Sequence, residues 1–329
     1  MTDRSSIAPD KSITKPLKVY RFRPNHHDAQ WKHLKLHGES TKHMSTPVQL
    51  RLVTWNLDFS ADHAVERFNT ALEYLQFDVF KCDDGQSPGP CCILLQEVRP
   101  ECLKELLNTD WVRDHFAVTP VDPAKWPGPH YQYGNVTLVE RTVPIREAQI
   151  VFYGRTEHER SAIVLDLRMV STRGFKRNLR VVNTHLESMA TGRPNRLHQL
   201  KECAVLLRHS STGGIVAGDL NAFDQDFDDA LLSLELVDAA SELDDEDAFT
   251  WGEQGGGAGE FPRSRMDRML SYTPAGKTRF DITPPQKIGK GLQCGELWVS
   301  DHFGLEATLT APEGPEDVNE EEEITPESQ

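Results

Sequence analysis

Between residues 48 and 311 the sequence alternates short runs of apolar and β-branched residues with segments that repeat apolar residues at helical spacing. The predicted strands are Leu50–Trp55, Cys91–Gln96, Asn135–Val139, Gln149–Phe152, Ala162–Leu167, Leu179–Asn183, Ile215–Ala217, Met266–Leu270 and Phe303–Leu309. Helices are predicted at Val65–Leu75, at Leu197–Leu207 and, directly after Pro100, at Glu101–Leu107. Strands that alternate with a few helices over this length predict an α/β fold built as a layered sandwich.

The regions on either side of this segment differ from it in composition. Residues 1–47 are polar and hold five of the thirteen histidines, so we interpret them as a partly disordered N-terminal extension. Its three large aromatic residues, Tyr20, Phe22 and Trp31, leave open that part of it docks on the domain. Residues 312–329 include eight acids and are predicted to form an acidic, disordered tail.

The net charge of −15 limits the partners that the chain can bind. A protein that coats nucleic acid by counterion release needs a basic surface, so we expect binding at an end or along one local basic stripe. No run of 18 apolar residues and no signal peptide occurs, so we expect no membrane and a location in the cytoplasm or nucleus. The six cysteines fit no zinc spacing and are interpreted as small buried residues in a reducing compartment.

Five strand-like runs end in polar residues that a core strand has no reason to carry. These residues are Asn56, Glu97, His185, Asp219 with Asn221, and Asp301 with His302. Each one alone has a structural explanation, as a helix cap, a turn former or a paired core histidine. A carboxylate beside an apolar run is costly unless it is paired, protonated or bound to a metal. Because strand ends in a layered α/β fold meet on one rim, the five together predict a functional site.

This set of side chains is rich in oxygen and contains no thiol. Such ligands suit Mg²⁺, or Mn²⁺, held by one or two carboxylates and completed by water and substrate phosphate, whereas zinc favours more His or Cys. A metal on the phosphate, a carboxylate that positions water and imidazoles that stabilise developing charge are the parts of phosphodiester hydrolysis. No serine nucleophile elbow, P-loop or glycine-rich dinucleotide motif competes with this interpretation.

Six motifs resemble, in order and spacing, those of the endonuclease/exonuclease/phosphatase superfamily. They are Thr-Trp-Asn (54–56), Leu-Gln-Glu-Val (95–98), Asn-Thr-His-Leu-Glu-Ser (183–188), Gly-Asp-Leu-Asn (218–221), Met-Asp-Arg-Met (266–269) and Ser-Asp-His-Phe-Gly-Leu (300–305). Within the superfamily the chain is most similar to the 5′-tyrosyl-DNA phosphodiesterases, on the residues that follow His185, on Thr250-Trp251 with Gln254, and on 265–268. The resemblance implies a DNase I-like, four-layer sandwich of two mixed β-sheets flanked by helices, with residues 48–311 as the catalytic domain.

The resemblance also implies a role for each motif residue. Glu97 would be the main Mg²⁺ ligand, supported by Asn56 and Asp301. Asp219 would hold and activate the attacking water, and Asn221 would orient the water and the phosphate.

The histidines and the substrate contacts complete the roles that the resemblance implies. His185 and His302 would contact the non-bridging oxygens, and Asp267 would orient His302 by fixing its tautomer. The candidate substrate-binding residues are Tyr133, Ser188, Trp251 and Arg160. Ser188 and Arg160 have a surface explanation of equal weight, because both residue types usually face solvent.

Four features bear on the substrate. The tyrosyl-DNA branch usually has an Arg where this chain has Phe223, and its apolar loop after Thr-Trp is replaced here by residues 252–260, which are rich in glycine. The acids that follow the Asn221 motif, Asp224 to Asp229, are interpreted as the start of a helix. The basic stretch 168–180 is either a solvated hairpin or a phosphate contact near the metal.

We therefore expect a monomeric, Mg²⁺-dependent phosphodiesterase that removes a tyrosyl adduct from a 5′-phosphate end of nucleic acid, DNA in preference to RNA. The same chemistry on another substrate stays open: an abasic-site or 3′-end nuclease, an RNA deadenylase or a small-molecule phosphodiesterase. A binding module without activity on the same fold is the remaining alternative. The intact acids and histidines of the site argue against this module.

Overall fold

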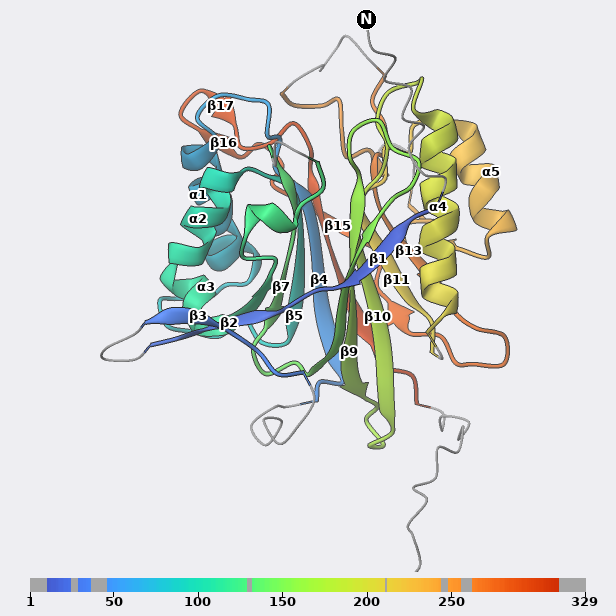
Figure 1. Cartoon of the computed structure of the whole chain (residues 1–329), viewed down its shortest axis with the longest axis horizontal. Helices are drawn as coiled ribbons and strands as arrows, with labels where there is room; N and C mark the ends of the chain where they lie inside the picture. The colour runs from blue at the N-terminus through green and yellow to red at the C-terminus, as the bar shows by residue number, and fades with distance from the viewer. Residues whose placement is uncertain are drawn as a thin grey trace, which may run out of the picture.

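Two β-sheets packed face to face form the centre of the molecule, and helices cover their outer faces (Figure 1). The computed structural model describes residues 11–24, 29–36, 46–128, 132–210, 212–243, 248–255 and 262–313. Three apolar cores separate the four layers: one between the sheets and one beneath the helices on each side. The predicted four-layer α/β sandwich is confirmed.

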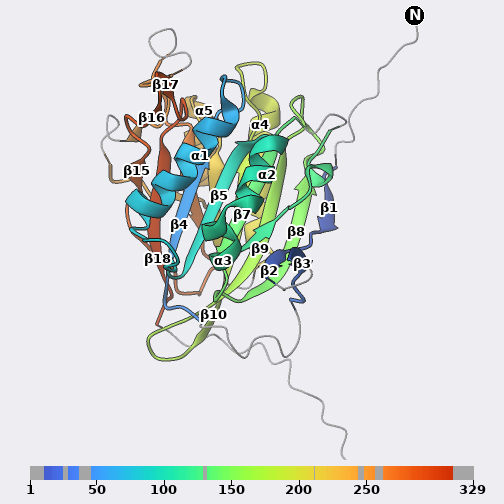
Figure 2. The same cartoon turned by 90° about the vertical axis from the view of Figure 1, so that its left-hand side faces the viewer.

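The first sheet has nine strands and lies beneath the helices of the N-terminal half (Figure 2). Its strands, in order across the sheet, are β14 (Asp281–Ile282), β18 (Gly304–Thr310), β4 (Gln49–Asn56), β5 (Cys91–Val98), β7 (Gly134–Glu140), β6 (Phe116–Thr119), β2 (Tyr20–Arg23) and β3 (Gln30–His33), with β15 (Gln286–Ile288) also pairing β18. The covering helices are α1 (Ala64–Tyr74), α2 (Pro100–Asn108) and α3 (Asp110–His115). A π-helical turn, Leu75–Val79, continues α1.

The second sheet has seven strands and is covered by two helices (Figure 1). Its order is β1 (Ile13–Pro16), β8 (Ile145–Phe152), β9 (Ser161–Val170), β10 (Lys176–His185), β11 (Gly214–Asp219), β13 (Asp267–Tyr272) and β12 (Val237–Asp238). The helices are α4 (Arg193–Arg208) and α5 (Gln225–Ser233). A short 3₁₀ turn (Pro123–Lys125) and the small hairpin of β16 (Gln293–Cys294) and β17 (Leu297–Trp298) complete the described elements.

Alternation along β9 illustrates how the sequence builds two cores from one strand. Ile163, Leu165 and Leu167 belong to the core between the sheets, whereas Ala162 and Val164 belong to the core under the helices. A strand that is covered on both faces buries both sets of side chains, so it reads as a continuous apolar run. The cysteines follow the same logic: Cys82, Cys91, Cys92, Cys102 and Cys203 are buried, and Cys294 is partly buried.

The predicted central elements are all present, with ends that shift by a few residues. The nine predicted strands correspond to β4, β5, β7, β8, β9, β10, β11, β13 and β18, and the three predicted helices to α1, α2 and α4. The acids after Asn221 do start a helix, because Asp224 caps α5 by accepting the N–H of Phe227. The described elements after residue 48 that were not predicted are short: α3, β6, β12, and β14 to β17.

The N-terminal segment contributes strands to both sheets. β1 pairs antiparallel with β8 in one sheet, and β2 pairs with β6 in the other. Between these two strands, Leu17 and Val19 are buried in the core that separates the sheets. The boundary drawn at residue 48 therefore leaves out three strands of the sandwich. The disorder expected at residues 1–10 and 314–329 concerns segments outside the described residues.

In the described part of the chain, no helix combines the length and the apolar character that a membrane span requires.

Deleting residues 1–19 should destabilise the domain, because it removes β1 and exposes the positions that Leu17 and Val19 fill. Two buried aliphatic side chains correspond to a loss of about 3 kcal/mol or more in the free energy of unfolding. Urea unfolding followed by tryptophan fluorescence measures it. The control deletes residues 314–329, an acidic segment that lies outside the described residues. Equal stability of the two truncated proteins would show that the N-terminal strands contribute little.

Candidate active site

Strand register places three of the predicted residues side by side at one end of the seven-stranded sheet. β10 and β11 are parallel and pair His185 with Asp219, and antiparallel β13 pairs Asp219 with Asp267. All three side chains are buried. The carboxyl ends of the two parallel strands thus share one rim with the amino end of β13, as the sequence predicted for His185 and Asp219.

The nine-stranded sheet brings a second group to the same rim. β4 and β5 are parallel and end at Asn56 and Glu97. The pairing of β5 with β7 is irregular between Leu95 and Val98, and Glu97 has a φ of 58°, in the left-handed region. This break in the ladder lets Glu97 leave the regular alternation of the strand. Its Oε2 accepts the N–H of Phe59 at 2.8 Å, and its Oε1 lies 3.8 Å from Nδ1 of His185.

A buried polar seam joins the two sheets beneath this rim. Nε2 of Gln96 donates to Oδ1 of Asn183 at 2.8 Å and to Oγ1 of Thr54 at 3.0 Å. Nδ2 of Asn183 donates in turn to Oγ1 of Thr137 at 3.1 Å and to the carbonyl of Val136. Gln96 and Asn183 belong to two of the six sequence motifs, but the sequence analysis gave neither of them a role. The signal was present, because each amide precedes a rim residue by one or two positions within an apolar run.

Asp219 is the most connected side chain of the rim. Its Oδ1 accepts the N–H of Asn221 at 2.9 Å, and its Oδ2 accepts Nδ2 of Asn56 at 2.9 Å. Nε2 of His185 lies 3.1 Å from the same Oδ2. Burial alone would raise the pKa of Asp219, but His185 and His302 outweigh it and hold the pKa below its ordinary value. Asp219 is therefore a fixed, ionised carboxylate shared by the two sheets.

The tautomer of His185 follows from its two partners. Nδ1 lies 3.0 Å from a guanidinium nitrogen of Arg160, which can only donate, so Nδ1 accepts. The proton of the neutral ring is then on Nε2, where it faces Asp219. Burial, together with the charge of Arg160, lowers the pKa of His185 to about 4. His185 is neutral at pH 7 and donates a hydrogen bond to Asp219.

His302 is in the opposite state. Its Nδ1 lies 2.8 Å from Oδ2 of Asp267, and its Nε2 lies 3.8 Å from Asp219 and 3.9 Å from Asp301. Burial lowers the pKa of His302, but Asp267, Asp301 and Asp219 outweigh it and raise the pKa well above its ordinary value. The rim therefore pairs a neutral histidine with a cationic one, on either side of one carboxylate.

Comparison with known proteins shows to which family the chain with this site belongs. The sequence profile of the Endonuclease/Exonuclease/phosphatase family matches residues 53–302. The chain belongs to this family. The match spans every strand of the rim, from β4 to the Asp301-His302 pair, so the family assignment rests on the whole site rather than on one motif.

Similar proteins of this family point to one branch, as the sequence predicted. A 5′-tyrosyl-DNA phosphodiesterase of Caenorhabditis elegans is 26% identical over 192 residues, which are 55% of this chain and 49% of that protein. The chain thus spans about half the length of this relative.

Solved structures of the same branch share the fold. TDP2 of D. rerio, complexed with single strand DNA product, superposes with a TM-score of 0.62 at 19% identity, over 80% of this chain and 99% of that chain. TDP2 of C. elegans superposes with a TM-score of 0.59 at 20% identity, over 80% of this chain and 75% of that chain.

The residues present fit a hard divalent cation of the kind expected for the family. Burial raises the pKa of Glu97 to about 7, and the nearby Asp301 carboxylate adds to this rise. Burial is also the main cause that raises the pKa of Asp301. The nearby cations, Arg160 for Glu97 and His302 for both carboxyl groups, offset the burial only in part, so a bound cation would stabilise both carboxylates. Glu97 and Asp301, with the amide of Asn56, are the residues that would hold it.

A second group of side chains also has the spacing of a metal site: Asp219, Asp267 and His302. Its members are already engaged in part, because His302 donates to Asp267 and Asp219 accepts from Asn56 and Asn221, although Oδ1 of Asp267 has no hydrogen-bond partner among the described residues. A cationic imidazole is not a metal ligand. We therefore expect a cation to fit the Glu97 group better than this one.

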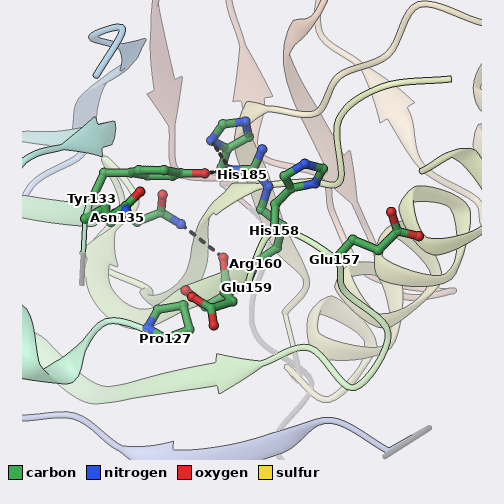
Figure 3. Close-up of a pocket in the computed structure, with 11 residues that line it drawn as sticks. Pro127, Tyr133, Asn135, Glu157, His158, Glu159, Arg160 and His185 are labelled. Carbon is green, nitrogen blue, oxygen red and sulfur yellow. Dashed lines mark hydrogen bonds between the residues drawn. The ribbon is translucent and has the colours of Figure 1, made fainter. Parts of the chain in front are cut away.

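A cavity of about 340 Å³ opens from the rim on the side of β7 and β9 (Figure 3). The rings of Tyr133 and His185 both point at the Arg160 guanidinium, which donates to the hydroxyl of Tyr133 at 3.2 Å. A further nitrogen of Arg160 lies 3.3 Å from Oγ of Ser188. Arg160 is only 5% exposed, so its surface explanation is wrong. Phe59, which sequence reasoning missed, stacks on Tyr133 with ring centroids 4.1 Å apart.

Trp251 lies on the other side of the rim. Its Nε1 donates to Oδ2 of Asp301 at 2.9 Å, and its backbone bridges to Ser264 and His302. All twelve residues predicted for the site thus belong to one connected set of contacts, while the chemical role of each is a matter of the proposed function.

The basic stretch 168–180 does not reach this site. It forms the turn between β9 and β10 and the first half of β10, whereas His185 ends that strand. Ten residues of extended strand span roughly 30 Å. Arg180 pairs with Asp166 through two bonds of 2.7 Å, and Arg177 donates to the carbonyl of Pro312. The interpretation as a phosphate contact near the metal is therefore wrong.

Replacing Asp267 by Asn should lower kcat by about 10- to 100-fold, because the carboxylate fixes the tautomer of His302 and stabilises its cation. Asp267 raises the pKa of His302, so without this charge His302 loses its proton at a lower pH. The alkaline limb of the kcat profile should move to lower pH, and a rate series from pH 6 to 10 measures it. An unchanged limb would separate Asp267 from the protonation of His302.

Proposed function

We propose that this chain is a Mg²⁺-dependent phosphodiesterase that removes a tyrosyl adduct from a 5′-phosphate end of DNA. The observation that supports it best is the ionised Asp219, held by both sheets between neutral His185 and cationic His302. The substrate class follows the relatives, which are a 5′-tyrosyl-DNA phosphodiesterase and TDP2 with single strand DNA product. The protein acts as a monomer, on DNA in preference to RNA.

Asp219 and Asn221 handle the attacking water. The water donates a hydrogen bond to Asp219, whose position is fixed by Asn56 and by the backbone N–H of Asn221. Nδ2 of Asn221 donates to the carbonyl of Leu186 at 3.1 Å, which holds the amide in place and leaves its oxygen to orient the water. The water oxygen bonds to phosphorus and gives its proton to Asp219, as the bond from phosphorus to the phenolic oxygen breaks and its electron pair leaves with the phenolate.

His302 and His185 face the phosphate from either side of Asp219. The cationic His302 donates to a non-bridging oxygen as negative charge develops, and Asp267 keeps that donor charged and oriented. His185 contributes an imidazole whose orientation is set by Arg160. Mg²⁺ on Glu97, Asp301 and Asn56 supplies neutralisation of the phosphate oxygens when it is bound.

The leaving group fits the cavity beside Arg160. A tyrosyl side chain departs as a phenolate of pKa about 10, so it needs less help from a proton donor than an alcohol does. Tyr133, stacked on Phe59, offers an aromatic wall for its ring, and the Arg160 guanidinium offers charge for its oxygen. Ser188 and Trp251 complete the walls on the two sides of the phosphate.

Asp219→Asn should reduce the release of tyrosine from an oligonucleotide with a 5′-phosphotyrosyl end by at least about 10²-fold, with the fold intact. The assay measures the clean 5′-phosphate product with and without Mg²⁺, and Asp229→Asn on exposed α5 is the matched control. Activity like that of the wild type in Asp219→Asn would remove Asp219 from the mechanism. Hydrolysis of a simple aryl phosphodiester, but not of this oligonucleotide, would keep the chemistry and point to another substrate.

Glu97→Gln should raise the Mg²⁺ concentration that gives half of the maximal rate by about 10-fold or more, because it removes one ligand charge. Glu73→Gln, at an exposed position of α1, is the control and should leave the curve in place. A metal titration of the rate compares the three proteins. If Glu97→Gln gives the wild-type curve, the cation is held elsewhere.

A further inference from the structure

The loop that carries Asn221 also presents an aromatic ring to solvent. Phe223 lies two residues after Asn221, and its N–H donates to the Asn221 carbonyl at 3.1 Å. Its side chain is 37% exposed, although large apolar side chains in this fold are mostly buried. The ring therefore lies on the loop of Asn221, the residue proposed to orient the phosphate, without belonging to the core and without a role in the proposed chemistry.

A buried arginine fixes the position of this ring. The Arg196 guanidinium lies over the Phe223 ring, 4.3 Å from its centroid, and Arg196 is fully buried. It donates to the carbonyls of Glu187 at 2.8 Å and Met189 at 3.1 Å, and to Oδ2 of Asp224 at 2.7 Å. Because the guanidinium covers one ring face, the exposed surface of Phe223 belongs to the other face and the edge.

The acids around Phe223 are paired with arginines from neighbouring elements. Asp224 pairs with Arg196, Asp226 with Arg193, and Asp228 with Arg268. The first two contacts link α4 to the start of α5, and the third links α5 to β13. The two helices lie side by side on the seven-stranded sheet (Figure 1). The acidic run therefore repels phosphates less than its sequence suggests. The acids in turn neutralise the charges of these arginines, so this side of the site attracts a nucleic acid strand only weakly through charge.

We propose that Phe223 is a stacking platform for the nucleobase next to the scissile phosphate. A ring with one face held by a guanidinium and the other face free is preorganised to stack, because binding costs it little side-chain entropy. Base stacking on an aromatic side chain tolerates any sequence and does not depend on net charge. In an acidic protein it provides affinity for a DNA end that electrostatics does not supply. Exposed Met189, whose carbonyl the same guanidinium binds, extends the apolar surface.

This inference rests on the proposed function for its substrate, but a binding measurement tests it separately. Calorimetry compares two ligands, a 5′-phosphorylated tetrathymidylate and the same strand with an abasic 5′ nucleotide. Each ligand is titrated into the wild-type chain and into Phe223→Ala, Phe223→Tyr and Leu232→Ala. Leu232 is a matched control, because it is apolar, 86% exposed and on α5.

Phe223→Ala should weaken binding of the thymidylate strand by about 10-fold and leave binding of the abasic strand unchanged. Phe223→Tyr should restore binding, and Leu232→Ala should bind both ligands like the wild type. Equal weakening of both ligands would mean that Phe223 only supports the loop, and no weakening would mean that it makes no contact. Either result overturns the inference, as does a wild-type chain that does not prefer the thymidylate strand. The hydrolysis assay with the phosphotyrosyl oligonucleotide tests the proposed function independently of this binding measurement.

Discussion

The hydrogen bond from Asn56 to Asp219 is the contact on which the site depends, because it joins the ends of two strands from different sheets. Below it, Gln96 and Asn183 form a second connection through the core. Buried amides that lose their partners cost about 1–3 kcal/mol each, whereas apolar contacts tolerate small slides. The polar seam therefore fixes how one sheet lies on the other. The positions of all the rim residues follow from that fixed relation.

The carboxyl groups of the rim fall into two groups whose pKa values are shifted in opposite directions. Glu97 and Asp301 carry raised pKa values because the charges of Arg160 and His302 offset the effect of burial only in part. Asp219 carries a lowered pKa because two histidines face it. Carboxylates thus differ in their ionisation within one site, which suits them to the different tasks proposed for them, a metal ligand in one half and an acceptor for water in the other. The difference comes from the neighbours that each strand end meets across the gap between the sheets.

The sequence predicted the residues of the site better than their arrangement. A polar residue at the end of an apolar run is a local signal, so Asn56, Glu97, His185 and Asp219 could be found from it. Strand register is not local, so the pairing of Asp219 with Asp267 and the burial of Arg160 could not be predicted. β1 was not predicted for another reason. Its four side chains are exposed, so its sequence shows no alternation of buried and exposed residues, and its backbone pairing with β8 cannot be read from the sequence. The distance of the basic stretch from the site could likewise not be predicted, because it depends on the length and direction of β10, which starts in this stretch and ends at His185.

The pairing of β4 with β18 has a consequence for synthesis. β4 lies near the start of the domain and β18 near its end, and Leu50 pairs with Leu309. A contact that joins such distant parts of the chain forms slowly and cannot form before both strands have been made. Asp301 and His302 directly precede β18, so a nascent chain lacks two groups of the site until its last strand leaves the ribosome. Any hydrolytic activity therefore begins only after nearly the whole domain has been translated.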